Sequence, residues 1–342
     1  MKIQNSFDKT LVDFMLLHGC FIENPGLMTG KAGLVLGLFE ATYIDKRVEI
    51  EEIAFDFLQE VLAWEFKEYS FKRGKAGVVC GLLYLIENGF IECDFQELYG
   101  AEFKETLCYV KKLDIKKTNV DDCIGYIIYL FVIKDKITIS EFEEIWNILS
   151  LILDDYCQFI PKNPIELRFF YCYAAKIFAI YNLIDNNYRH YLEKPLNSIL
   201  TIHMHIQENA YICINIKFAF QLFRYSKICK DNALFAQSQS LMKTIFHNSV
   251  INALSLEEII DQFYIIKQLY NDEDRPDYVE SIYKQIESLF TYNNLISTQS
   301  VFHQTKLQSL VALESGIPKF ILMRNMSNLG VLANHRNEFL FI

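Results

Sequence analysis

The sequence is short of the residues that break regular structure, with only 13 glycines and 6 prolines among 342 residues. Their combined share lies well below the usual value of about 12%. This shortage argues against collagen-like chains, flexible linkers and turn-rich β-sandwiches. Hydrophobic residues make up 51% and charged residues 22%, which is the composition of a globular chain and not of a disordered one.

The chain also lacks a block of basic charge, and its formal net charge is −10. Nucleic-acid binding needs clustered lysines and arginines that contact phosphates. The longest basic grouping joins Lys111 and Lys112 to Lys116 and Lys117, and Asp114 interrupts it. We interpret this grouping as a solvated loop and expect no nucleic-acid partner.

Two further absences concern the compartment of the protein. No Cys-x-x-Cys pair occurs among the nine cysteines, and an odd number of cysteines in a chain of this size is typical of reduced thiols in a cytosolic protein. The longest strongly apolar run, 124–133, is half the length of about 20 residues that a membrane-spanning helix needs. Charged residues in the first turns fit no signal peptide. We therefore expect a cytoplasmic protein without membrane insertion.

What the chain does contain is helical periodicity, with apolar residues at i, i+3, i+4 and i+7 over most of its length. Ser140 with Glu143, and Ser255 with Glu258, have the spacing of a capping box at a helix start. Strand-like alternation is scarce and no segment resembles a domain linker, which predicts one all-α domain over 1–342. The predicted helices lie near 48–66, 94–110, 140–158, 164–184, 208–228, 231–247, 255–270 and 277–291.

An internal repeat is visible in the glycines. The tetrapeptide Gly-Lys-Ala-Gly occurs at Gly30–Gly33 and again, 44 residues later, at Gly74–Gly77, and a Val/Leu-rich stretch follows each copy. Gly125 and Gly316 begin similar apolar segments further along. A period of 44 to 48 residues is typical of helix-pair repeats, of which the chain could hold about seven. Glycine at a helix start permits a positive φ, or a close approach of neighbouring backbones.

These repeats resemble the lanthionine synthetase C-like (LanC-like) family. The resemblance is clear over residues 20–135, faint over 165–300 and weak around Gly316. It implies an α/α toroid, in which two concentric rings of helices surround a central cavity and the glycines of the repeat begin the inner helices.

The resemblance also implies a chemistry. In catalytic members of the family, two cysteines and one histidine hold a zinc ion, which lowers the pKa of a substrate cysteine so that its thiolate adds to dehydroalanine or dehydrobutyrine. The ligands lie in Trp-Cys-x-Gly and Cys-His-Gly motifs, and this sequence has neither. Cys213 falls near the place of the first motif, and no cysteine follows Cys229. The departure favours a protein without a zinc cofactor and without cyclase activity.

Each of the other candidate site residues has two interpretations, one functional and one structural. His203 and His205, with Cys213, form the only grouping with metal-binding character, but two positions along a helix point about 200° apart. Asp121 and Asp122 precede Gly125 and would face the cavity mouth in a toroid. The alternative for these two carboxylates is capping of the helix start.

Two hypotheses for the function follow. The first is a divergent LanC-like protein that is catalytically inactive and binds a peptide or partner protein in the central cavity, as an accessory to peptide modification. The second is an enzyme on the same toroid, either a zinc-dependent thioether-forming cyclase or a carboxylate-based glycosidase-like enzyme. A helical-repeat scaffold without a cavity ligand is a third possibility.

Overall fold

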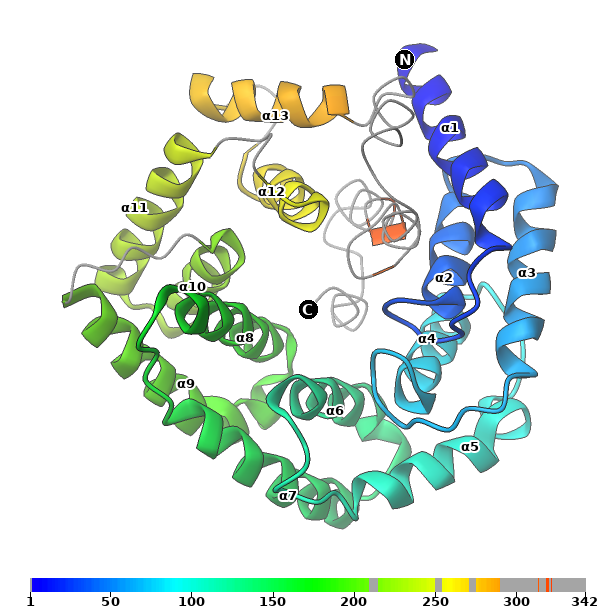
Figure 1. Ribbon diagram of the computed structural model, residues 1–342, viewed down its shortest axis with the longest axis horizontal. Helices are drawn as coiled ribbons and strands as arrows, with labels where there is room; N and C mark the ends of the chain where they lie inside the picture. The colour runs from blue at the N-terminus through cyan, green and yellow to red at the C-terminus, as the bar shows by residue number, and fades with distance from the viewer. Residues whose placement is uncertain are drawn as a thin grey trace. The chain divides into compact units, whose positions relative to one another are not determined.

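The computed structural model describes residues 2–208, 215–249, 254–270 and 275–289, together with 313, 318, 319 and 321. Every regular element in these ranges is a helix, and none of their residues forms a β-strand (Figure 1). The all-α prediction is therefore confirmed. No helix within the described ranges is both long and apolar enough to cross a bilayer.

The described residues form thirteen α-helices and one 3-10 helix, η1 (Lys134–Lys136). Their bounds are α1 (Lys2–Gly19), α2 (Lys31–Ala41), α3 (Val48–Leu62), α4 (Lys75–Glu87), α5 (Phe95–Val110), α6 (Val120–Ile133), α7 (Ile139–Cys157), α8 (Pro164–Leu183), α9 (Asn186–Glu208), α10 (Ile216–Cys229), α11 (Asn232–Asn248), α12 (Leu256–Leu269) and α13 (Asp277–Leu289).

The chain divides into two compact units, and the first consists of residues 1–106 with 250–333. In this unit α2 contacts α1, α3 and α4. Every residue of α2 is buried, as is α4 from Lys75 to Leu85, whereas α3 buries only one face. The unit thus pairs a buried helix with an amphipathic one, which is the arrangement expected of a helix-pair repeat.

The second unit consists of residues 107–249 with 334–342. Here α6 contacts α7 and α8, and α8 contacts α9 and α10. The fully buried helix is again accompanied by amphipathic neighbours, since α6 is buried from Cys123 to Phe131 and α7 on one face only. The prediction of a single domain over 1–342 stays a prediction.

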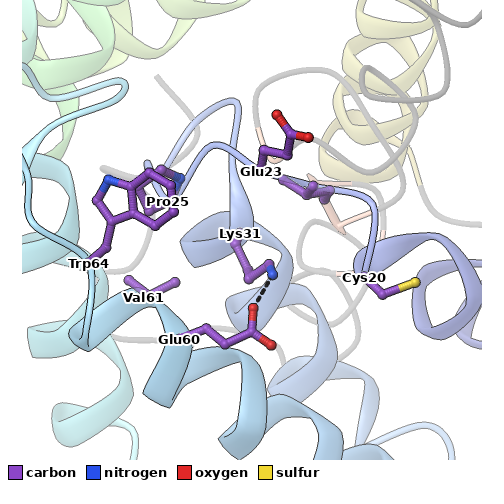
Figure 2. Close-up of a pocket in the computed structure, with 8 residues that line it drawn as sticks. Cys20, Glu23, Pro25, Lys31, Glu60, Val61 and Trp64 are labelled. Atoms are coloured by element: carbon purple, nitrogen blue, oxygen red, sulfur yellow. Dashed lines mark hydrogen bonds and ion pairs between the residues drawn. The ribbon is translucent and has the colours of Figure 1, made fainter.

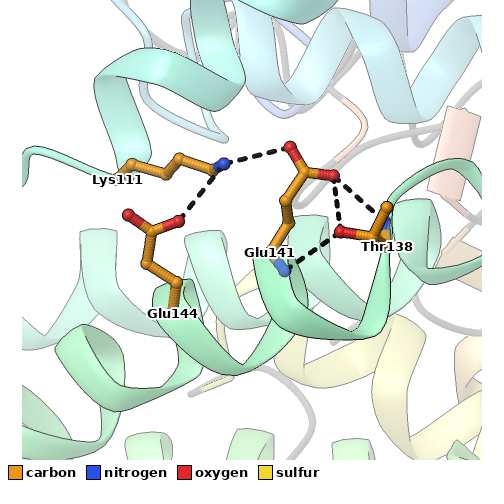
Figure 3. Close-up of polar contacts among 4 residues, drawn as sticks. All are labelled: Lys111, Thr138, Glu141 and Glu144. Carbon is orange, nitrogen blue, oxygen red and sulfur yellow. Dashed lines mark hydrogen bonds and ion pairs between the residues drawn. The ribbon is translucent and has the colours of Figure 1, made fainter.

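The helix starts carry their own sequence signals, and one of them was misassigned from the sequence. Helix α7 begins with a capping box made by Thr138 and Glu141, not by Ser140 and Glu143 (Figure 3). The Thr138 hydroxyl accepts from the Glu141 N–H at 3.2 Å, while Glu141 accepts from the Thr138 N–H at 3.0 Å. The bond from the Thr138 N–H, and then the one from Lys111 at 3.0 Å, lower the pKa of the Glu141 carboxyl group.

Two other helix starts complete the comparison with the sequence. Ser255 and Glu258 form the capping box of α12 as predicted. Helix α10 begins at Ile216 instead of residue 208, because the side chain of Asn215 accepts from the Phe218 N–H and caps the helix there. Residues 209–214 lie outside the described ranges.

Candidate functional site

The two Gly-Lys-Ala-Gly segments belong to loops that fold back over the first turn of α2 and of α4. In the first loop the Lys31 N–H donates to the Asn24 carbonyl at 2.7 Å, and in the second the Lys75 N–H donates to the Glu68 carbonyl at 3.0 Å. The donor and the acceptor in the second loop each lie 44 residues after their counterparts in the first loop. The sequence repeat is therefore a repeat of backbone geometry.

The glycines make these loops possible because no side chain would fit at their positions. A Cβ atom on Gly33 would lie 2.1 Å from the Leu27 carbonyl oxygen, and one on Gly77 would lie 1.9 Å from that of Phe71. A Cβ atom on Gly30 would likewise lie 2.3 Å from the Asn24 carbonyl oxygen, and one on Gly74 would lie 2.5 Å from that of Glu68.

The structure corrects one of the two reasons offered for these glycines. The φ angle is −138° at Gly30 and −111° at Gly74, so neither position needs the left-handed region. The close approach of the backbone is the reason that applies.

The two loops also touch each other. The Met28 N–H donates to the Lys72 carbonyl at 3.0 Å. A Cβ atom on Gly26 would lie 2.4 Å from the Cα of Arg73. Successive repeats are thus joined through backbone atoms at the start of their buried helices.

A buried lysine stands at the first position of each of these helices and pairs with a glutamate of the following helix. Lys31 pairs with Glu60 of α3, and Lys75 pairs with Glu105 of α5. Both lysine side chains are only 11% exposed. A cation at a helix N-terminus opposes the helix dipole, so the carboxylate offsets an unfavourable interaction as well as the burial.

The second of these pairs has an additional partner. The Tyr69 hydroxyl donates to Glu105, and the Lys75 ammonium lies 5.3 Å from the centroid of the Tyr69 ring. The pKa of Glu105 is lowered by its hydrogen bonds to Lys75 and then to Tyr69. Sequence reasoning missed both glutamates, although the spacing itself recurs, with 29 residues from Lys31 to Glu60 and 30 from Lys75 to Glu105.

The third repeat begins differently. Asn119, not a glycine, caps α6 by accepting from the Asp122 N–H at 2.9 Å, and Asp121 pairs with Lys176 of α8 at 3.0 Å. Asp121 and Asp122 therefore lie in the first turn of α6, where their negative charge favours the helix dipole. Gly125 is buried further inside the same helix.

The two candidate histidines lie on α9 and point in different directions. His203 is fully buried, and its Nδ1 lies 3.0 Å from the Tyr171 hydroxyl. Burial lowers the pKa of His203 to about 4, so its ring is neutral at pH 7. His205 is exposed. Cys213 and Gly316, the remaining site candidates, lie outside the described residues.

The described residues do not fit a zinc site of the LanC-like kind. Nowhere in the described ranges do three His, Cys, Asp or Glu side chains gather where they could hold a metal ion. Burial raises the pKa of the Cys80 and Cys123 thiols far above neutrality and that of Cys157 to about 12. Buried thiols of this kind pack as small apolar side chains.

The helices and their loops define an all-α protein built from repeated helix pairs. Among solved structures the chain is similar to nisin cyclase, with a TM-score of 0.60 and 12% sequence identity over 99% of this chain and 97% of that one. The fold class is therefore the α/α toroid that the sequence predicted, and the resemblance to LanC-like proteins is confirmed at the level of the fold. No protein-family model matches the chain. A comparison with curated proteins also gives no significant match.

Proposed function

We propose that this chain is a divergent LanC-like protein that binds a peptide, or a partner protein presenting one, without catalysing thioether formation. Its role would be that of an accessory to peptide modification. The observation that carries the proposal is a fold similar to that of nisin cyclase with intact glycine-led loops, combined with two histidines on α9 of which one is buried and the other exposed.

The histidines support the non-catalytic part of the proposal. His203 packs its ring against Phe218 at a centroid distance of 5.0 Å and uses Nδ1 to contact Tyr171. His205, two residues on, projects to the opposite side of α9. The sequence adds that no Cys-His-Gly motif is present and that no cysteine follows Cys229.

The peptide-binding part is supported by the fold, because binding needs the shape of the protein and not its metal ligands. The net charge of −10 favours a peptide that carries positive charge.

The test uses a synthetic peptide that carries one dehydrobutyrine, one cysteine and a fluorescent label. We expect saturable binding by fluorescence anisotropy, and loss of free thiol no faster than in the peptide alone. A matched peptide with threonine in place of dehydrobutyrine should bind with similar affinity, because binding does not use the alkene.

Two results would contradict the proposal. Accelerated loss of the peptide thiol, abolished in a Cys213→Ser variant, would establish an enzyme that depends on Cys213 instead. Absence of binding by either peptide would remove the peptide as the partner.

A further inference from the structure

A pocket of about 270 Å³ opens beside the first glycine-led loop, within the first compact unit (Figure 2). Pro25 of the loop, Lys31 at the start of α2, and Glu60 and Val61 of α3 line it, together with Trp64 beyond the end of α3. Ligand pockets usually measure about 300–1,000 Å³. This pocket is therefore of a size for one side chain and not for a whole peptide.

The second repeat shows what occupies the corresponding place there. The repeat of 44 residues matches Pro25 to Tyr69 and Lys31 to Lys75, and Glu105 has the partner role of Glu60. Tyr69 places its ring beside the Lys75 ammonium and its hydroxyl on Glu105. In the second repeat a phenol ring thus lies beside the ion pair that Lys75 and Glu105 form directly.

The first repeat has the same lysine and glutamate, but the ring beside Lys31 is that of Phe57, which cannot donate a hydrogen bond to Glu60. Proline has a much shorter side chain than tyrosine. The presence of Pro25 at the position that corresponds to Tyr69 therefore leaves a pocket. The Glu60 side chain is 56% exposed at its wall, and Trp64 is 52% exposed at its rim. Figure 2 shows Trp64 beside Pro25, with Lys31 and Glu60 facing each other.

We propose that this pocket binds the phenol ring of a tyrosine side chain from a partner peptide, in the position that Tyr69 occupies in the second repeat. The phenol hydroxyl donates to the Glu60 carboxylate, and the ring lies beside the Lys31 ammonium. Val61, Pro25 and Trp64 supply apolar contact with the ring. This proposal rests on the proposed function in one respect, namely that a peptide partner supplies the tyrosine.

The polarity of the pocket favours tyrosine over other aromatic residues. Glu60 already accepts from Lys31, and a carboxylate retains further lone pairs for a second donor. Phenylalanine fills the same space without donating. Lys31 also lies 5.1 Å from the centroid of the Phe57 ring, so its ammonium is placed against aromatic rings before any ligand arrives.

The first experiment compares N-acetyltyrosinamide with N-acetylphenylalaninamide by saturation-transfer NMR on the full chain. One hydrogen bond to a charged group predicts that the tyrosine derivative binds about tenfold or more tightly than the phenylalanine derivative. Emission from Trp64 should change along the same curve, since the other tryptophan, Trp146, is buried. Equal binding of the two derivatives, or no binding of either, would overturn the proposal.

A pair of variants at Pro25 tests the position of the ring. Pro25→Tyr supplies the ring from the chain itself, as Tyr69 does in the second repeat, and should weaken binding of N-acetyltyrosinamide by about tenfold or more. Pro25→Ala is the matched control, which removes the proline without filling the pocket and should weaken binding only slightly, through the loss of one apolar contact. Similar affinities in the two variants would place the ligand elsewhere.

The outcomes also separate this proposal from the proposed function. Binding of the dehydrobutyrine peptide without any binding of N-acetyltyrosinamide would refute the tyrosine pocket alone. If the chain binds N-acetyltyrosinamide but neither the dehydrobutyrine peptide nor its threonine counterpart, the tyrosine pocket is supported and the peptide is refuted as its partner.

Discussion

Replacement of Gly77 by alanine should destabilise the protein strongly. The new Cβ would lie 1.9 Å from the Phe71 carbonyl oxygen and 2.9 Å from the Leu27 Cβ. Non-bonded heavy atoms prefer a separation of about 3.5 Å or more, and a backbone oxygen cannot rotate away as the end of a side chain can.

The magnitude follows from two opposing effects. Overpacking of a buried position typically costs about 1–3 kcal/mol, and displacement of the loop backbone places Gly77→Ala at the upper end of that range. Alanine regains up to about 1 kcal/mol relative to glycine inside a helix. We therefore expect a net loss of about 2 kcal/mol in the free energy of unfolding.

Gly100 offers the matched control within the same unit. A Cβ there would meet the Gln96 Oε1 at 2.8 Å, which is the free end of a flexible side chain. Gly100→Ala should change stability by less than about 1 kcal/mol. Urea unfolding followed by circular dichroism compares the two variants, and equal midpoints would refute the reasoning about the glycine-led loops.

Two further predictions concern the second unit. His203 has a pKa of about 4 in the folded chain and an ordinary value of 6.5 when unfolded, so stability should fall by about 3 kcal/mol as pH drops from 6.5 to 4. His203→Gln should flatten that part of the urea-midpoint profile, and an unchanged slope would contradict the assignment. Thr138→Ala should cost about 1 kcal/mol in urea unfolding through the lost cap of α7, whereas Ser140→Ala should cost less than about 0.5 kcal/mol. Equal losses would mean that Thr138 is not the cap.

The architecture was predictable because the repeat contains glycines that no other residue can replace without a steric clash. Gly33 and Gly77 lie against carbonyl oxygens of their own loops, so a side chain is excluded in both copies and the tetrapeptide keeps its form. The amphipathic helices between the buried ones, such as α3 and α7, bury one face only, and their helical periodicity made the fold class predictable.

The contacts between elements were harder to predict. Glu60 and Glu105 lie on helices whose exposed faces carry many acids, so nothing local marks them as partners of Lys31 and Lys75. The cap of α7 was misplaced because Thr138 and Ser140 both stand three residues before a glutamate, and only tertiary packing decides where the helix begins.

For the two histidines, the sequence predicted their relative direction but not the burial of His203. The helical spacing of His203 and His205 predicted that they diverge, as they do. The burial of His203 against Tyr171 and Phe218 depends on residues 32 and 15 positions away in the chain, on α8 and α10. Such long-range packing leaves no local pattern.

The metal content of the purified full chain tests the central proposal most directly. We predict that elemental mass spectrometry finds far less than one zinc ion per chain, and that the chain keeps its helical circular dichroism in chelator. One tightly held zinc ion per chain would contradict a non-catalytic role and would direct attention to Cys213 as a ligand.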